Sequence, residues 1–190
     1  MTGCRDYNVL LRPDELLCFE ISNLKGFAYS LIGEYKSRQS TAHISVMIYQ
    51  RQKPYIMEQA IDNLNIRLRQ MPAVKLQLNN FNFFIHKNDT FDIYAAIEPS
   101  AVSDKWFAEL RKQFRISKSQ LLPHISIARA ISVDQFYRLW PRFRYMKCRI
   151  TFHINCISIL ERDSLDKRLK WNIYREVFLK TKDEQMLHAI

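Results

Sequence analysis

One short pattern occurs twice in the chain and constrains the fold more than any other feature of the sequence. His43 and His124 each begin a His-apolar-Ser-apolar segment, which continues through Ser45 in the first copy and Ser126 in the second. Each copy follows a loop-like stretch and is expected to open a β-strand. Because side chains alternate across a strand, each copy would present an imidazole and a hydroxyl on one face and apolar side chains to the core.

The predicted elements around the two copies are of mixed type. In the first half of the chain, helical and alternating apolar spacing predicts a short buried strand at Leu16–Ile21, a helix capped by Asn23, a strand at His43–Tyr49, and a helix that starts at Pro54 and buries Ile56, Ala60, Leu64 and Leu68. Strands over 74–85 and 91–97 and a helix over 106–114 should follow. The remaining predicted elements are a strand at Ile125–Ala130, a helix capped by Ser132 and Gln135 that Pro141 should kink or end, and strands near Arg149–Leu160 and Trp171–Leu179. A change of phase at Asn79 and Asn80 indicates a β-bulge. Two similar runs of helix, strand, helix and strands favour an α+β protein of two related lobes, with mostly antiparallel sheets, over a doubly wound parallel sheet.

Several classes of protein are excluded by what the sequence lacks. None of the three glycines lies in a GxGxxG or GxxxxGK pattern, so a Rossmann fingerprint and a P-loop are absent. No apolar run approaches the roughly 20 residues of a membrane span, and the first residues lack the apolar region of a signal peptide, so a cytoplasmic protein is expected. The four cysteines lack zinc-site spacing and are expected to be free thiols, with Cys18 and Cys156 buried on strands.

The charge of the chain is positive and unevenly distributed. The formal net charge is +10, and residues 96–190 hold 18 basic side chains against 10 acidic ones. Such an excess attracts polyanions, RNA among them. A well-solvated basic surface is the alternative interpretation.

Two imidazoles and two hydroxyls in one cleft would suit phosphodiester chemistry. One histidine can accept a proton while the other donates one, and serine hydroxyls can donate hydrogen bonds to phosphoryl oxygens. Cleavage of a cyclic phosphodiester needs these groups and no metal or cofactor. A serine nucleophile is one alternative, although the strained GxSxG turn is absent. Two unrelated core histidines are the other.

At this point the sequence resembles the 2H phosphoesterases, and most closely the bacterial 2′-5′ RNA ligase and cyclic phosphodiesterase branch. Paired His-x-Ser/Thr-x motifs about eighty residues apart are the signature of that family, and His43, Ser45, His124 and Ser126 match it. Arg129 matches the arginine that commonly follows the second motif. The resemblance runs from about residue 16 to about residue 179.

The resemblance implies a fold and a function. The chain, 1–190, would be one bilobal domain with terminal extensions at 1–15 and 180–190, and two pseudo-twofold-related αβ lobes would flank a central cleft. It would be a metal-independent phosphodiesterase, in the reverse direction a 2′-5′ RNA ligase, that acts on 2′,3′-cyclic phosphate or 2′-5′ linked RNA ends or small nucleotides. His43 and His124 would be the acid/base pair, and Ser45, Ser126 and Arg129 would hold the phosphate. No obligate protein partner is indicated.

The sequence departs from the family pattern after the first motif. An aromatic residue often stacks on the nucleobase there, but Ile48 occupies that place and Tyr49 follows it. Simple alternation along the strand would put Tyr49 on the face of His43 and Ser45, so Tyr49 is a candidate base-stacking residue; capping of the strand end is the alternative. A module that binds a nucleotide or an RNA end without turnover is the alternative function.

Overall fold

The computed structural model describes residues 3–166 and 168–181. Its elements, in chain order, are β1 (Arg5–Pro13), α1 (Glu15–Ile32), β2 (Ile44–Gln52), α2 (Pro54–Leu68), β3 (Val74–Ile85), β4 (Phe91–Ile97), α3 (Ala101–Phe114), the 3-10 turn η1 (Lys118–Gln120), β5 (His124–Ile131), α4 (Val133–Tyr145), β6 (Thr151–Asp163) and β7 (Asn172–Phe178).

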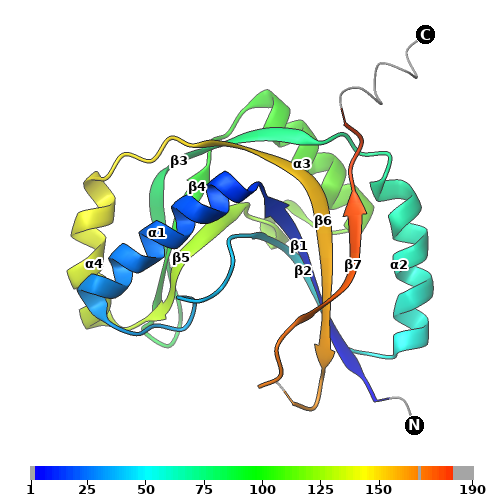
Figure 1. The fold of residues 1–190 in the computed structure, drawn as a ribbon, viewed down its shortest axis with the longest axis horizontal. Coiled ribbons are helices and arrows are strands. Elements are labelled where there is room, and N and C mark those ends of the chain that lie inside the picture. The colour runs from blue at the N-terminus through cyan, green and yellow to red at the C-terminus, as the bar shows by residue number, and fades with distance from the viewer. Residues whose placement is uncertain (1–2, 167, 182–190) are drawn as a thin grey trace.

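The strands form one antiparallel sheet in the order β2-β1-β6-β3-β4-β5, and β7 pairs with β6 on a branch from this path. The prediction of an α+β fold with antiparallel pairing is therefore confirmed. β3 joins two halves of the sheet, because its residues 74–77 pair with β6 and its residues 78–85 pair with β4. The two histidine motifs consequently lie in different halves, the first on β2 and the second on β5 (Figure 1).

A bulge in β3 marks the change of partner. The register with β4 shifts between Leu78 and Phe81, and Asn80 has a positive φ of 58°. Its backbone N–H donates to the Cys148 carbonyl at 2.8 Å, and its side-chain oxygen accepts from the Cys148 N–H at 3.2 Å. The bulge predicted at Asn79 and Asn80 is thus confirmed, and it allows β3 to leave β6 and continue along β4.

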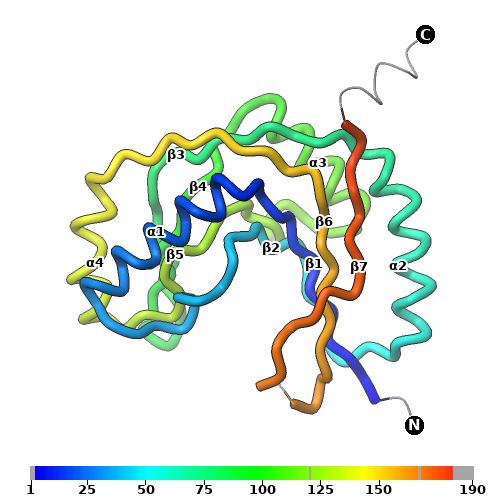
Figure 2. Tube along the Cα trace, viewed as in Figure 1, coloured from blue at the N-terminus to red at the C-terminus, as the bar shows by residue number. Residues whose placement is uncertain are grey.

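The helices cover the two halves separately. α2 packs on the half formed by β1, β2 and β6, where Met57 and Ile61 meet Val9 and Ile159. α1 and α4 contact each other and lie against the half formed by β3, β4 and β5, as the trace in Figure 2 shows. The buried apolar side chains of both halves belong to one continuous core.

The first 32 residues differ most from the sequence-based expectation. Residues 5–13 form β1, which the pattern did not indicate, and the strand predicted at Leu16–Ile21 is wrong because those residues lie in α1. The helix begins after Asp14, whose carboxylate accepts the Leu17 N–H at 3.0 Å, and not after Asn23. A short apolar run fits a strand and a buried helix face equally well, so the cap decides. Cys18 is therefore half-buried on a helix, whereas Cys156 is buried on β6 as expected.

Two of the later helices begin where expected. Pro54 opens α2, and Ser132 and Gln135 form a reciprocal capping box at the start of α4. α3 begins earlier than the predicted 106–114, at Ala101, where Ser100 and Ser103 form a capping box. Two further details are corrected. The buried face of α2 carries Met57 and Ile61 in place of the predicted Ile56 and Ala60. α4 also continues past Pro141. Proline has no N–H to donate to the carbonyl of Tyr137, but Tyr137 lies on the exposed side of the helix, where water can replace the missing bond.

Among the described residues, no helix combines the length and the apolar character needed to cross a bilayer.

Candidate active site

The two His-x-Ser segments place their side chains as the alternation predicts. In β2, Ile44 is buried and Ser45 is exposed, while His43 immediately precedes the strand and is half-buried. In β5, Ile125 is buried, whereas His124 and Ser126 are half-buried. Each half of the sheet therefore presents one imidazole and one hydroxyl on the face opposite its apolar side chains.

Both motif strands contain a bulge directly after the motif serine. In β2, Leu10 pairs with Ser45 but the next residue, Val9, pairs with Met47. In β5, Tyr94 pairs with Ser126 but the next residue, Ile93, pairs with Ala128. One extra residue in each strand inverts the alternation that follows. The third residue after each serine therefore returns to the face of the histidine.

These two positions hold different side chains. In β5 the position is Arg129, so its guanidinium lies on the same face as His124 and Ser126. In β2 it is Ile48, which is half exposed, with 51% of its surface accessible. The bulge in β5 thus explains the His-x-Ser-x-x-Arg spacing. Of the two equivalent positions, only the one in β5 carries a positive charge.

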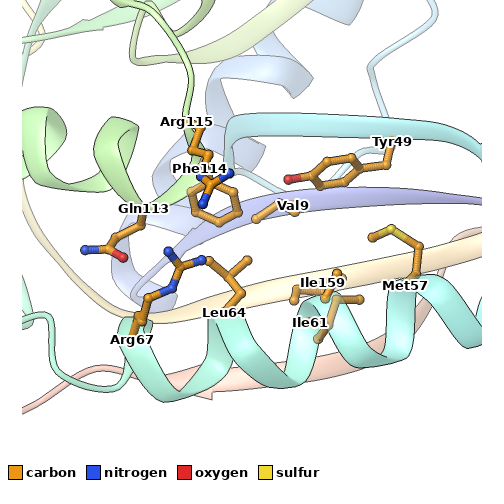
Figure 3. A pocket seen from close by; sticks show the side chains of 11 residues that line it. Val9, Tyr49, Met57, Ile61, Leu64, Arg67, Gln113, Phe114, Arg115 and Ile159 are labelled. Carbon is orange, nitrogen blue, oxygen red and sulfur yellow. The ribbon is translucent and has the colours of Figure 1, made fainter.

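The same bulge shows that the predicted facing of Tyr49 is wrong. Tyr49 pairs with Tyr7, a fully buried residue on the core face of β1. Its ring lies on the side of the sheet that α2 covers and lines a cavity of about 170 Å³ with Met57 and Arg67 of that helix, as Figure 3 shows. Tyr49 therefore lies on the opposite face of the sheet from His43, because simple alternation does not hold across a bulge.

The two imidazoles are held in the same way. The Nδ1–H of His43 donates to the Thr41 carbonyl at 2.8 Å, and the Nδ1–H of His124 donates to the Leu122 carbonyl at 2.7 Å. A hydrogen bond from Nδ1 to a carbonyl fixes the neutral ring as the tautomer with its proton on Nδ1. Nε2 of each ring is then the atom that accepts or donates a proton during chemistry.

The charges around the rings place the two histidines in one electrostatic environment. Burial is the largest effect on the pKa of His43 and lowers it, and the charges of Lys25, Arg129 and His124 lower it further against the opposing bond to Thr41. Burial also lowers the pKa of His124, where Asp92 opposes and Arg129 adds to the effect. Since Arg129 acts on both rings and β2 contacts β5, the structure brings the two motifs together.

Asp92 anchors the arginine of the second motif. Its carboxylate accepts the Ala130 N–H at 2.7 Å, lies 3.1 Å from His86 Nε2 and lies 3.7 Å from Arg129 Nε. Asp92 is buried while the Arg129 side chain is 56% exposed. The guanidinium is therefore paired with Asp92 through Nε and otherwise largely exposed.

Two aromatic rings that the sequence analysis did not single out flank His124. The centroids of Phe84 and Tyr94 lie 5.1 Å and 5.0 Å from the imidazole, and the two aromatic rings stack on each other at 4.3 Å. Tyr94 pairs directly with Ser126. Strand alternation places Tyr94 on the polar face of β4, but only the pairing of β4 with β5 shows which side chain it meets.

A cavity of about 220 Å³ adjoins His43. Thr41, Ala42 and His43 form one wall, and β1, β6 and β7 contribute Leu10, Arg12, Ser158, Leu160 and Ile173. Arg12 and Ser158 both donate to Glu176, at 3.2 Å and 3.5 Å. The cavity therefore combines apolar walls with polar groups, as sites for small organic ligands do. The sequence analysis did not single out the lining residues of β1, β6 and β7, because they come from three different strands.

Comparisons with known proteins agree with this arrangement. Residues 13–166 match the family model described as the 2′-5′ RNA ligase superfamily. Among solved structures, Escherichia coli LigT in complex with 3′-AMP is similar over 94% of this chain and 99% of its own, with a TM-score of 0.60 and 14% identity. A structure described as a phosphoesterase covers 93% and 99%, with a TM-score of 0.61 and 13% identity.

A further structure has the same fold. The protein TT0787 of Thermus thermophilus covers 93% of this chain and 99% of its own, with a TM-score of 0.60 and 12% identity. No relative among curated protein sequences matches the chain. At these identities the solved structures show a shared fold, while the family model shows membership.

Proposed function

The chain belongs to the 2′-5′ RNA ligase superfamily, and on that premise we propose that it is a metal-independent phosphodiesterase that acts on 2′,3′-cyclic phosphate or 2′-5′ linked ends of RNA. The observation that carries the proposal is the matched pair of imidazoles. Each is held through Nδ1 by a backbone carbonyl, and each stands beside a motif serine on one of two contacting strands.

The reaction follows from what the side chains can supply. One Nε2 accepts a proton from water as the water oxygen attacks phosphorus. The other imidazole, protonated at Nε2, donates that proton to the departing ribose oxygen, so that the bond from phosphorus to that oxygen breaks. Ligation through a 2′-5′ bond uses a different nucleophile: the 5′-hydroxyl of a second RNA replaces water, gives its proton to the base and attacks phosphorus, while the 3′ oxygen of the cyclic phosphate departs with a proton from the acid. Cleavage of a 2′-5′ linkage by the neighbouring 3′-hydroxyl is the reverse of this ligation, and the two histidines then exchange roles.

Three further side chains would hold the phosphoryl group. The hydroxyls of Ser45 and Ser126 flank the imidazoles and can donate to the non-bridging oxygens. Arg129, tethered by Asp92, adds a positive charge where negative charge grows in the transition state. This set supplies acid, base and oxyanion stabilisation, so the mechanism requires no metal.

The nucleoside of the substrate would occupy the cavity beside His43. Its volume of about 220 Å³ and its mixed lining suit a ribose and part of a base. Leu160 and Ile173 offer apolar surface there, in place of the stacking role first considered for Tyr49. The complex of Escherichia coli LigT with 3′-AMP supports a nucleotide ligand for this fold.

We further propose that residues 3–166 and 168–181 form a single bilobal domain, whose two sheet halves are lobes related by a pseudo-twofold axis. Three local features recur in both halves and support this relation. They are the Nδ1 bond of each histidine, the bulge after each motif serine, and a buried aspartate that accepts the N–H of a residue with positive φ. In one half, Asp6 accepts from Arg51 (φ 54°), and in the other, Asp92 accepts from Ala130 (φ 52°).

A panel of substrates tests the proposed function. The purified chain, with EDTA present, should hydrolyse nucleoside 2′,3′-cyclic monophosphates and RNA that ends in a 2′,3′-cyclic phosphate to monophosphates. Binding of these compounds without turnover would contradict the proposal and favour a binding module. Turnover that EDTA abolishes would contradict the metal-independent mechanism.

A further inference from the structure

A lysine that no part of the proposed mechanism uses lies beneath the active site. Lys25 is on the inward face of α1, and only 3% of its surface is exposed. Its ammonium donates to the Ser37 carbonyl at 3.1 Å, the Ser40 carbonyl at 2.6 Å and the Ser40 hydroxyl at 2.8 Å. An ammonium has three N–H donors and no acceptor. Each of its hydrogens therefore has an acceptor, all of them on the loop before the first motif.

This buried charge has no carboxylate partner. Within residues 3–166 and 168–181, the interactions of Lys25 are limited to that loop and to longer-range electrostatics. The charged groups that face it are Arg129 of β5 and His43, and Cys18 lies on its own helix. Burial, with a smaller contribution from the charge of Arg129, lowers the pKa of Lys25 to about 8. A buried cation without an anion is costly, and this one remains largely protonated at neutral pH.

The loop that Lys25 holds connects the two motifs. The Ser37 hydroxyl donates to the Ile127 carbonyl at 3.3 Å and accepts the Arg129 N–H at 3.0 Å, so the loop is attached to β5 beside the bulge. Ser37 is itself buried. A few residues later, Thr41 provides the carbonyl that holds His43. The position of His43 relative to Arg129 therefore depends on this loop.

We propose that Lys25 is a positioning residue of the catalytic centre. Lys25 fixes the loop that places His43 relative to the second motif, and the phosphate of the bound substrate compensates its buried charge. This inference rests on the proposed function for the identity of the anion. Lys25 does not itself bind the phosphate, because its three donors are already used.

The charge of Lys25 should act on one histidine and not on the other. It is among the groups that lower the pKa of His43, whereas the pKa of His124 responds to burial, the Leu122 bond, Asp92 and Arg129. Loss of the charge should therefore raise the pKa of His43 and leave that of His124 in place. A purely structural lysine would give no such selective effect.

Nuclear magnetic resonance titration of the full chain tests the positioning role. In Lys25→Met the pKa of His43 should rise while that of His124 stays constant, and in Lys25→Arg, which keeps the charge, His43 should titrate as in the wild type. Lys36→Met is the matched control, since Lys36 is exposed next to Ser37 and should change neither ring. An unchanged His43 pKa in folded Lys25→Met would overturn the proposal.

The wild-type chain provides a second test that needs no variant. The Lys25 side-chain resonance should titrate near pH 8, and addition of inorganic phosphate should move its midpoint upward. Phosphate that shifts both imidazole resonances but leaves Lys25 unchanged would overturn the proposal while the proposed function stands. Phosphate without effect on either imidazole would count against the phosphate site and against charge compensation together.

Kinetics provide the third readout. Misplacement of His43 should lower kcat for a 2′,3′-cyclic nucleotide about 10- to 100-fold in Lys25→Met, because catalytic geometry tolerates displacements of about 1 Å poorly. The KM should rise as well, since the buried charge no longer favours the phosphate. Wild-type kinetics in folded Lys25→Met would contradict the proposal.

Discussion

At the scale of single residues, each motif imidazole is oriented by one backbone carbonyl. The bonds of His43 to Thr41 and of His124 to Leu122 are nearly equal in length and join residues two apart in sequence. Such a bond orients the ring and sets its tautomer without a carboxylate partner. The orientation of both rings is therefore set by the loops that lead into β2 and β5.

Removal of either imidazole should abolish turnover and preserve binding. We expect His43→Ala and His124→Ala each to lower kcat by about 100- to 10,000-fold, the range that one acid or base contributes. The dissociation constant for 3′-AMP should change only a few-fold, because Ser45, Ser126 and Arg129 remain. His153→Ala is the control, since that side chain is 62% exposed on β6 beside Asp14. Activity close to wild type in either motif variant would contradict the acid/base pair.

The pH dependence should reflect the lowered pKa of both rings. Burial and positive charge make the protonated form of each ring harder to reach, so both should lose their proton below the usual imidazole value of about 6.5. The bell-shaped profile of kcat/KM, which reports the free enzyme, should thus be centred below pH 6.5. The profile of kcat should lie at higher pH, because a bound phosphate anion favours protonation. A kcat/KM optimum well above pH 7 would conflict with this account.

At the scale of elements, two bulges decide which residues share the sheet face of the histidines. They invert the alternation after Ser45 and Ser126, so that Ile48 and Arg129 lie on that face and Tyr49 lies on the α2 side of the sheet. The two halves therefore differ chemically at the positions of Ile48 and Arg129. An arginine on one side and an isoleucine on the other would bind an anionic group asymmetrically, as a phosphate joined to a nucleoside requires.

A pair of neighbouring substitutions tests the bulge in β2. Ile48→Asp places a negative charge on the cleft face and should raise the KM for a cyclic nucleotide about tenfold, which corresponds to roughly 1.4 kcal/mol of repulsion. Tyr49→Phe removes only a hydroxyl on the far face and should change kcat/KM less than twofold. The reverse order of effects would show that β2 alternates without a bulge at this point.

Sequence patterns predicted the elements with local signals and missed those that depend on distant partners. Pro54 and the Ser132–Gln135 box marked helix starts because capping is local. β1 was missed, since its mixed sequence becomes a strand only between β2 and β6. The four motif side chains were identified from their alternation, and Arg129 from a family resemblance. The roles of Tyr49, Phe84 and Lys25 depend on bulges, pairing and loop packing, which leave no signal in the local sequence.

At the scale of the whole molecule, charge distinguishes an RNA substrate from a small nucleotide. The chain carries a net charge of +10, and residues 96–190, which include the second motif, hold 18 basic side chains against 10 acidic ones. A surface of this sign attracts a polyanion more strongly than a monoanion. We therefore expect RNA ends to be better substrates than free nucleotides.

Salt dependence tests this preference. The logarithm of KM should rise with the logarithm of salt concentration more steeply for an RNA of about ten nucleotides with a cyclic phosphate end than for the mononucleotide. The difference should be about 0.7 for each additional phosphate that the protein contacts. Parallel lines for the two substrates would contradict a role for the wider basic surface.

In the proposed mechanism His43 and His124 act on one phosphoryl group. A crystal structure of the wild-type chain with inorganic phosphate tests this most directly. We expect one phosphate with the Nε2 atoms of both imidazoles within hydrogen-bond distance and with the motif serines and Arg129 on its remaining oxygens. A phosphate bound elsewhere, or one that reaches a single imidazole, would contradict the two-histidine mechanism.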